Sequence, residues 1–98
     1  MTINKKQDGS KLSIALEGRL DTTTAPELEA ELKTSLNGIS ELVFDLSALE
    51  YISSAGLRVL LSAQKTMNKQ GEMTVTGANE TIMEIFDVTG FVDILNIE

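Results

Sequence analysis

The 98-residue sequence predicts an α/β fold, a small sandwich in which helices cover a mixed β-sheet. Three observations lead to this prediction: a hairpin signal near the N-terminus, two leucine-rich stretches with helical spacing, and short apolar runs that alternate with those stretches. With 42% hydrophobic residues, a chain of this length is expected to form one domain with one core, residues 1–98.

The first element is an antiparallel hairpin. Asp8-Gly9 separates Ile3 from a segment of alternating apolar residues, Leu12, Ile14 and Leu16. Asp-Gly between two extended runs is typical of a tight hairpin turn. The segment Gly18-Arg19-Leu20-Asp21 is then expected to leave the sheet.

A helix is predicted next. Thr24 and Glu27 have the spacing of a capping box, and Pro26 suits the first turn of a helix. An apolar stripe repeats every four residues: Leu28, Leu32 and Leu36. Asn37-Gly38 is expected to end this helix.

The central strand is predicted at residues 42–44, a continuous apolar run. A loop is expected from Asp45 onward, and a helix from about Ser54 to Gln70. Four of its residues are expected to face inward: Leu57, Leu60, Leu61 and Met67. Gly71 is expected to end it.

A third buried strand is marked by Met73, Val75 and Gly77. The order strand, helix, strand indicates a right-handed parallel crossover. A further helix is predicted from Asn79-Glu80 to Thr89-Gly90. The apolar residues after it, 91–97, are consistent with either a strand or a helical turn.

Composition excludes several classes of site. The net charge is −7, which disfavours nucleic acids and anionic membranes as direct partners. The absence of Cys and His excludes disulfides, thiolate nucleophiles, Cys/His zinc sites and a Ser-His-Asp triad. The polar N-terminus and the lack of a long apolar run predict a cytoplasmic protein, and neither a metal nor another cofactor is expected.

The serine pair Ser53-Ser54 is the strongest candidate site. It stands at a predicted helix N-terminus, where backbone N–H groups lack partners and the field is positive. Such a place suits a phosphate, so that a serine there is a plausible phosphorylation switch. The alternative is that these serines only cap the helix. Gly56 indicates a close approach of another backbone, either within the molecule or from a partner.

Two motifs resemble those of the STAS domain, and more narrowly of the bacterial anti-sigma factor antagonists. The first is Asp45-Leu46-Ser47 followed by Tyr51-Ile52-Ser53-Ser54-Ala55-Gly56-Leu57. The second is Gly18-Arg19-Leu20-Asp21 with Ala25 and Leu28. The resemblance covers essentially the whole chain, with Ser53 where aspartate is frequent in the family and Ala55 where serine or threonine is frequent.

The resemblance implies a regulatory protein rather than an enzyme. The unphosphorylated form would bind an anti-sigma factor, a GHKL-type serine kinase, and so release sigma factor. Phosphorylation at Ser54, or as second choice Ser53, would end binding, and a metal-dependent serine phosphatase would reverse it. The partner surface is expected at one end of the sheet: Asp21, Thr22, Ser53, Ser54, Gly56, Leu57, Arg58 and Leu61. The protein is expected to be a monomer or a weak dimer.

Two other functions remain open. The chain could be a STAS adaptor subunit of an ABC-type lipid transport system. It could also be a small metal-dependent enzyme that uses Asp21 and Asp45, although turn and cap roles at strand ends are the expected roles of Asp45.

Overall fold

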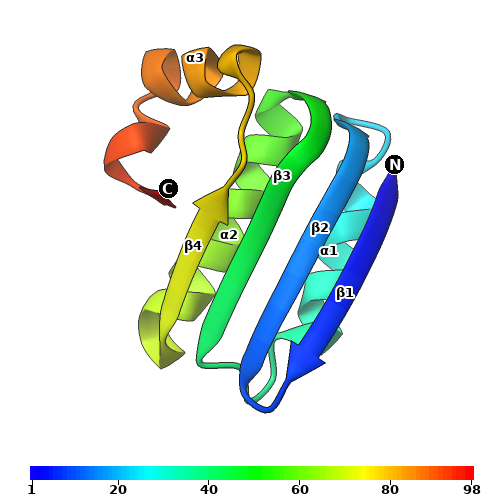
Figure 1. Cartoon of the computed structure of the whole chain (residues 1–98), viewed down its shortest axis with the longest axis vertical. Helices are drawn as coiled ribbons and strands as arrows, with labels where there is room; N and C mark the ends of the chain where they lie inside the picture. Colours follow the sequence, from blue (N-terminus) through cyan, green and yellow to red (C-terminus); the bar gives the residue numbers. More distant parts are fainter.

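The computed structural model describes all residues, 1–98, and shows a five-stranded mixed sheet with three α-helices (Figure 1). The elements in chain order are β1 (Thr2–Asp8), β2 (Lys11–Leu20), α1 (Ala25–Ser35), β3 (Glu41–Ile52), α2 (Ser54–Gln70), β4 (Glu72–Thr76), α3 (Glu80–Thr89), a 3₁₀ turn (Phe91–Asp93) and β5 (Asn96–Ile97). The predicted order of strands and helices is therefore confirmed, and the tail contains both a helical turn and a short strand.

The order of strands in the sheet is β1-β2-β3-β4-β5, the same as in the chain. Only β1 is antiparallel to its neighbour; β2 through β5 pair in parallel. When successive parallel crossovers have the same handedness and proceed in the same direction across the sheet, their helices lie on the same face of the sheet. Accordingly α1 and α2 lie side by side behind the sheet in Figure 1, and α3 lies near the carboxyl end of β3.

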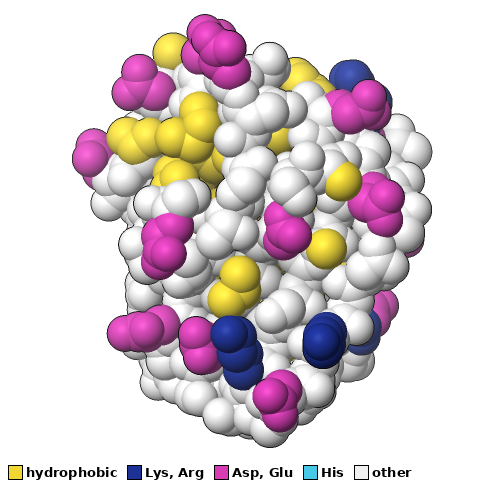
Figure 2. Space-filling model, in the orientation of Figure 1, with side chains coloured by type: hydrophobic (Ala, Val, Ile, Leu, Met, Phe, Trp, Pro, Cys, Tyr) yellow, Lys and Arg dark blue, Asp and Glu magenta, His cyan; other side chains and the backbone are white.

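Most of the core fills the space between this pair of helices and the sheet, and Ile82 and Phe86 of α3 also belong to it. All 24 residues of the buried cluster are apolar, and no polar or charged residue is buried. The opposite face of the sheet carries half-buried or exposed side chains such as Ser13, Asp45 and Thr74. Figure 2 views this open face, on which hydrophobic side chains are scattered except at one corner.

The predicted hairpin turn between β1 and β2 and the predicted bounds of α2 are confirmed. Gly9 has a φ of +63° in the β1–β2 turn, a conformation that glycine adopts without strain. Helix α2 has the predicted bounds. Gly71 follows its last residue as predicted, and no larger residue fits there because a Cβ would stand 1.8 Å from the carbonyl oxygen of Ser40.

The capping box predicted for α1 is wrong. Thr24 occupies the N-cap position, but its side chain accepts no hydrogen bond from the helix. Its hydroxyl instead accepts a hydrogen bond from the backbone N–H of Asp21 and donates one to the carbonyl of Arg19. The threonine thus holds the preceding turn rather than the helix end.

Two strand ends were also predicted wrongly. Strand β2 continues to Leu20 instead of leaving the sheet at Gly18, and β3 continues to Ile52 instead of entering a loop at Asp45. The two strands stay paired because β-bulges accommodate the shifts in their register. The register shifts once between Ala15 and Glu17 and again between Gly18 and Arg19.

Candidate functional site

The ends of β2 and β3 bring the two sequence motifs together. Leu20 pairs with Ile52, and the N–H of Ser53 donates a hydrogen bond of 2.9 Å to the carbonyl of Leu20. Asp21 and the serine pair follow directly after these paired residues. The prediction that Asp21 lies near the Ser54 end of the sheet is therefore confirmed.

The two serines differ in environment. Ser53 is the N-cap residue of α2 with an extended backbone, and its carbonyl accepts the N–H of Leu57 at 2.9 Å. Its hydroxyl oxygen is buried, has no hydrogen-bond partner and does not cap the helix. Ser54 is the first residue of the helix and is exposed. Of the pair, Ser54 therefore presents the accessible hydroxyl.

The charge around Ser54 favours an anion. The first turn of α2 contains no acidic residue, so that the positive end of the helix dipole is not offset by its own side chains. Arg58, four residues further on, is exposed and takes part in none of the ion pairs of the molecule. A residue at this spacing lies on the same side of the helix as Ser54.

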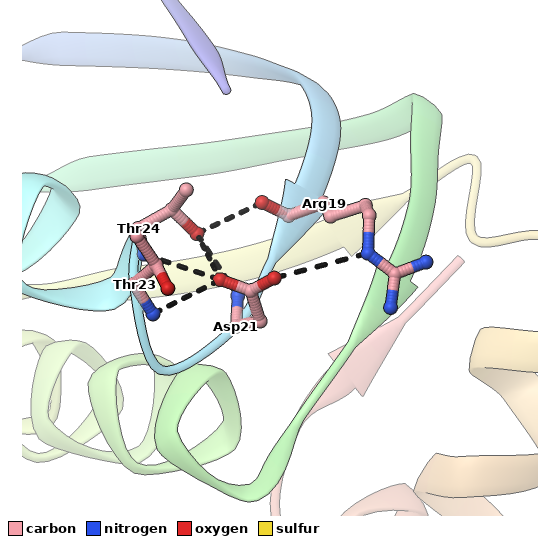
Figure 3. A network of polar contacts seen from close by, with 4 residues as sticks. All are labelled: Arg19, Asp21, Thr23 and Thr24. Carbon is pink, nitrogen blue, oxygen red and sulfur yellow. Dashed lines mark hydrogen bonds and ion pairs between the residues drawn. The ribbon is translucent and has the colours of Figure 1, made fainter.

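Asp21 organises the turn between β2 and α1 (Figure 3). Its Oδ1 accepts hydrogen bonds from the N–H groups of Thr23 at 3.0 Å and Thr24 at 3.2 Å. Its Oδ2 lies 3.8 Å from Nε of Arg19. Desolvation raises the pKa of Asp21, but the hydrogen bonds from Thr24 and Thr23 and the charge of Arg19 outweigh it, so that the pKa lies below its ordinary value of 3.8. The residue is therefore a charged structural element of the site.

Arg19 is the residue that sequence reasoning missed as a member of this site. Its guanidinium carbon lies 4.6 Å from the centre of the Tyr51 ring, a cation–π contact between directly paired positions of β2 and β3. Together with the ion pair to Asp21, this contact fixes an arginine beside the serine-bearing end of the sheet. The sequence signal for this contact was the alternation of exposed Arg19 with buried Leu20. It could be used only once the register between β2 and β3 was known.

The remaining predicted residues divide by burial. Thr22 is exposed, Leu61 is half-buried, and Gly56 and Leu57 are buried. A Cβ on Gly56 would stand 2.7 Å from Cγ of Leu20 and 2.9 Å from the carbonyl oxygen of Leu20. Tight internal packing thus accounts for the glycine. The exposed members are the ones available for direct contact.

Asp45 lies within β3, where the pairing with β2 shifts, and not at a strand end as predicted. Its Oδ1 accepts the N–H of Ser47 at 2.9 Å, and hydrogen bonds from Ser47 lower its pKa below 3.8 against a smaller opposing effect of desolvation. The structure contains no group of three or more carboxylates placed to hold a metal ion.

Comparison with known proteins identifies the family. A model of the STAS domain matches residues 2–98. The chain belongs to the STAS family. Among curated relatives, the protein BtrV of Bordetella bronchiseptica is 37% identical over 94 residues, covering 94% of this chain and 80% of the relative. The anti-sigma-B factor antagonist of Listeria monocytogenes is 31% identical over 97 residues, covering 96% and 84%.

Solved structures share the STAS fold. An anti-sigma factor antagonist from Mycobacterium paratuberculosis superposes with a TM-score of 0.88 at 24% identity, covering 98% of this chain and 83% of that one. The unphosphorylated form of the anti-sigma factor antagonist SpoIIAA gives a TM-score of 0.79 at 14% identity, with coverages of 99% and 87%. At these identities the likeness concerns the fold. None of the helices in this STAS chain has the length and apolar character needed to cross a bilayer.

Proposed function

We propose that this protein is an anti-sigma factor antagonist whose partner binding is switched by phosphorylation of Ser54. The observation that carries the proposal is the exposed hydroxyl of Ser54 at the start of α2, beside the Asp21 turn, in a STAS chain. The curated relative from Listeria monocytogenes, which is 31% identical to this chain, is named as an anti-sigma-B factor antagonist. SpoIIAA, which shares the fold, has been solved both without and with phosphate.

The proposed partner is an anti-sigma factor with serine kinase activity. In the unphosphorylated state the antagonist binds this kinase, and sigma factor is released. The kinase then transfers the γ-phosphoryl group of ATP to Oγ of Ser54; the new O–P bond forms as the β–γ bridge breaks, ADP leaves and the hydroxyl proton is lost. A metal-dependent serine phosphatase hydrolyses the ester and restores the hydroxyl. The use of ATP is consistent with a reaction in the cytoplasm.

The position of Ser54 favours a switch that acts on the interface and not on the fold. A phosphoserine adds about −1.5 to −2 charges at pH 7. At the first position of a helix this charge is favourable, because it faces free N–H groups and the positive end of the dipole. Against a partner surface that excludes water, the same charge is strongly unfavourable unless a counter-ion meets it. The modified protein should therefore stay folded and dissociate.

The test is phosphorylation of purified protein by the cognate kinase with ATP, followed by mass spectrometry of the peptides. Wild type and a Ser53→Ala variant should each gain one phosphate at Ser54, whereas Ser54→Ala should gain none. Ser53→Ala is the matched control because it removes the adjacent hydroxyl, which is buried. Phosphate on Ser53, with Ser54 unmodified, would overturn the assignment.

A further inference from the structure

The corner formed by α3 and the following 3₁₀ turn exposes large apolar side chains. Val88 is 82% exposed, Ile94 45% and Val92 37%, and these are the exposed large hydrophobic residues of the molecule. All three lie within seven residues of chain, while the other large apolar side chains are buried or half-buried. Contiguous exposed apolar groups of this kind are typical of interaction surfaces.

A shallow depression lies within this corner. It has a volume of about 360 Å³ and is lined by two apolar residues, Met83 and Val92, and three acidic residues, Glu80, Glu84 and Asp87. We call these five residues, with Val88 and Ile94, the α3 patch. Figure 2 shows hydrophobic side chains gathered at this corner of the molecule, with Asp and Glu around them and no Lys or Arg beside them.

The net negative charge of the chain is concentrated in the C-terminal part that contains the α3 patch. All 8 basic residues lie at or before Lys69, whereas six of the 15 acidic residues follow it, so that residues 70–98 carry nearly all of the net charge of −7. The six are Glu72, Glu80, Glu84, Asp87, Asp93 and Glu98. None of them forms an ion pair.

Of the acidic residues of α3, Glu80 lies in the first turn, where the helix dipole favours it, whereas Asp87 lies in the last turn, where the dipole disfavours it. Glu80 and Glu84 are four residues apart, and Glu84 and Asp87 are three apart, so that like charges repel along one side of the helix. The basic groups of a partner would relieve this repulsion. The charges of Glu84 and Asp87 are therefore better explained by a partner outside the molecule than by the stability of the helix.

From this combination we propose that the α3 patch is a docking surface for a basic amphipathic helix of another protein. The apolar side chains of Met83 and Val92 would receive the apolar face of that helix, and the carboxylates would pair with Lys or Arg at its borders. Anionic membranes and nucleic acids are repelled by the same charges. The helix α3 has ten residues, about 15 Å, which matches roughly three turns of a docked helix.

The α3 patch does not include Ser54, although α3 lies at the end of β3 that leads into the serine pair. Helix α3 is anchored beside β3, since the side chain of Asn79 donates hydrogen bonds to the carbonyls of Leu49 and Glu50. The patch lies on the side of α3 that faces away from these contacts and from the buried Ile82 and Phe86. A docked helix would thus be a second contact, made by residues other than those predicted for the partner surface around Ser54.

The experiment uses the intact protein and a fluorescein-labelled synthetic helix of roughly 18 residues, about five turns, with leucine on one face and lysine on the other. Fluorescence anisotropy measures its affinity, and amide shifts in ¹⁵N-labelled protein locate the contact. Binding should weaken about tenfold in Glu84→Lys/Asp87→Lys. It should weaken about as much in Val88→Ser/Val92→Ser, which leaves the charge unchanged.

The matched control is Glu27→Lys/Glu29→Lys, which makes the same change in net charge on exposed positions of α1. This control should keep most of its affinity, and the amide shifts should centre on Met83, Glu84 and Val92. Thermal melting confirms that each variant is folded.

Three outcomes would overturn the proposal. Equal losses in the α3 and α1 charge variants would mean that only net charge attracts the peptide. Full affinity of Val88→Ser/Val92→Ser would mean that the apolar side chains do not take part. Self-association of the protein in sedimentation equilibrium, abolished by Glu84→Lys/Asp87→Lys, would assign the patch to a second copy of the chain. None of these outcomes depends on the anti-sigma kinase, so that they leave the proposed function untouched.

Discussion

At the scale of single residues, Ser53 and Ser54 carry the same hydroxyl group in two different environments. The first hydroxyl is buried without a partner, although its residue holds the N-cap position; the second is exposed on the first turn of the helix. A third polar residue, Asn79, shows the opposite behaviour at the start of α3, where its Oδ1 accepts the N–H of Ile82 at 2.8 Å. Residue type and position alone therefore do not reveal which side chain caps a helix.

This difference gives a paired prediction on stability. Replacing an N-cap side chain that makes its hydrogen bond costs about 0.5–2 kcal/mol, so Asn79→Ala should lower the free energy of unfolding by about that amount. Ser53→Ala removes a buried hydroxyl that lacks a partner, and stability should stay the same or rise. Urea denaturation of the two variants checks the pair. A loss of cap-sized stability in Ser53→Ala would contradict the environment described for its hydroxyl.

Ser54 gives a prediction in which folding and binding separate. An acidic side chain at the start of a helix stabilises it by about 0.3–1 kcal/mol, so Ser54→Asp should melt at or above the wild-type temperature. The same charge held against the partner costs several kcal/mol, and each 1.4 kcal/mol is tenfold in affinity. Calorimetric titration with the anti-sigma kinase should therefore show most of the affinity lost.

The control for this variant is Ser54→Asn, which has nearly the same size without the charge. It should melt close to wild type and retain more affinity than Ser54→Asp. If the melting temperature of Ser54→Asp fell together with its affinity, the charge would be acting on the helix, and a switch by interface repulsion would have to be abandoned.

At the scale of elements, the junction of β2, β3 and α2 is packed so closely that one residue has no room for a side chain. A Cβ on Gly56 would stand 2.7 Å from Cγ of Leu20, 2.8 Å from Cγ1 of Ile52 and 2.9 Å from a backbone carbonyl oxygen. Because both strand ends are involved, the glycine couples the start of α2 to the turn that contains Asp21.

The corresponding prediction concerns Gly56→Ala. Alanine favours a helix by about 1 kcal/mol over glycine, but overpacking a core costs about 1–3 kcal/mol and here includes a backbone atom. We expect a net loss of about 1–2 kcal/mol in the free energy of unfolding, measured by urea denaturation. Ser62→Ala, at an exposed position of the same helix, is the control and should change stability by less than about 0.5 kcal/mol. An unchanged or higher stability of Gly56→Ala would show that the junction adjusts without cost.

The helices and strands also show which parts of the fold could be predicted from the sequence. The hairpin turn at Asp8-Gly9 and the bounds of α2 are set by neighbouring residues, and both were predicted. The length of β3 was not predicted, because its buried residues Leu46 and Leu49 are three positions apart. A bulge produces that spacing, and it breaks the alternation by which a strand is recognised.

The candidate site divides in the same way. The pattern of the serine pair and the helix start was sufficient to predict Ser54. The contact of Arg19 with the Tyr51 ring depends on a pairing across two bulged strands, which no local pattern specifies. The packing of Gly56 depends on the same two strands.

At the scale of the whole molecule, the change of stability at low pH depends on two carboxylates, that of Asp45 in β3 and that of Asp21 in the turn after β2. The pKa values of Asp21 and Asp45 both lie below the ordinary 3.8 because each carboxylate accepts hydrogen bonds from backbone N–H groups. A group whose pKa is lowered by folding stabilises the folded state when it is charged. Its contribution is thus fully present above pH 3.8 and is lost as the pH falls through the lower value of the folded protein.

We therefore expect the free energy of unfolding to fall as the pH drops below about 4, and to fall less in Asp45→Asn. Asparagine keeps an oxygen that can accept the N–H of Ser47, but it does not titrate. Denaturation at a series of pH values measures the effect, and carboxyl ¹³C titration gives the two pKa values directly. A titration midpoint of Asp45 at or above 3.8 would remove the basis of the prediction.

The agreement between chain order and sheet order also bears on how the molecule is assembled as it is made. Each strand from β2 onward pairs with the one synthesised just before it, and α1 and α2 each lie in the chain between the two neighbouring strands that they connect. No strand has to insert between two others, so the growing chain never waits for a distant segment in order to close its sheet. The acidic segment with its apolar corner is synthesised after β1 to β4. The region most exposed to foreign contacts is thus presented only after the rest of the sheet has its partners.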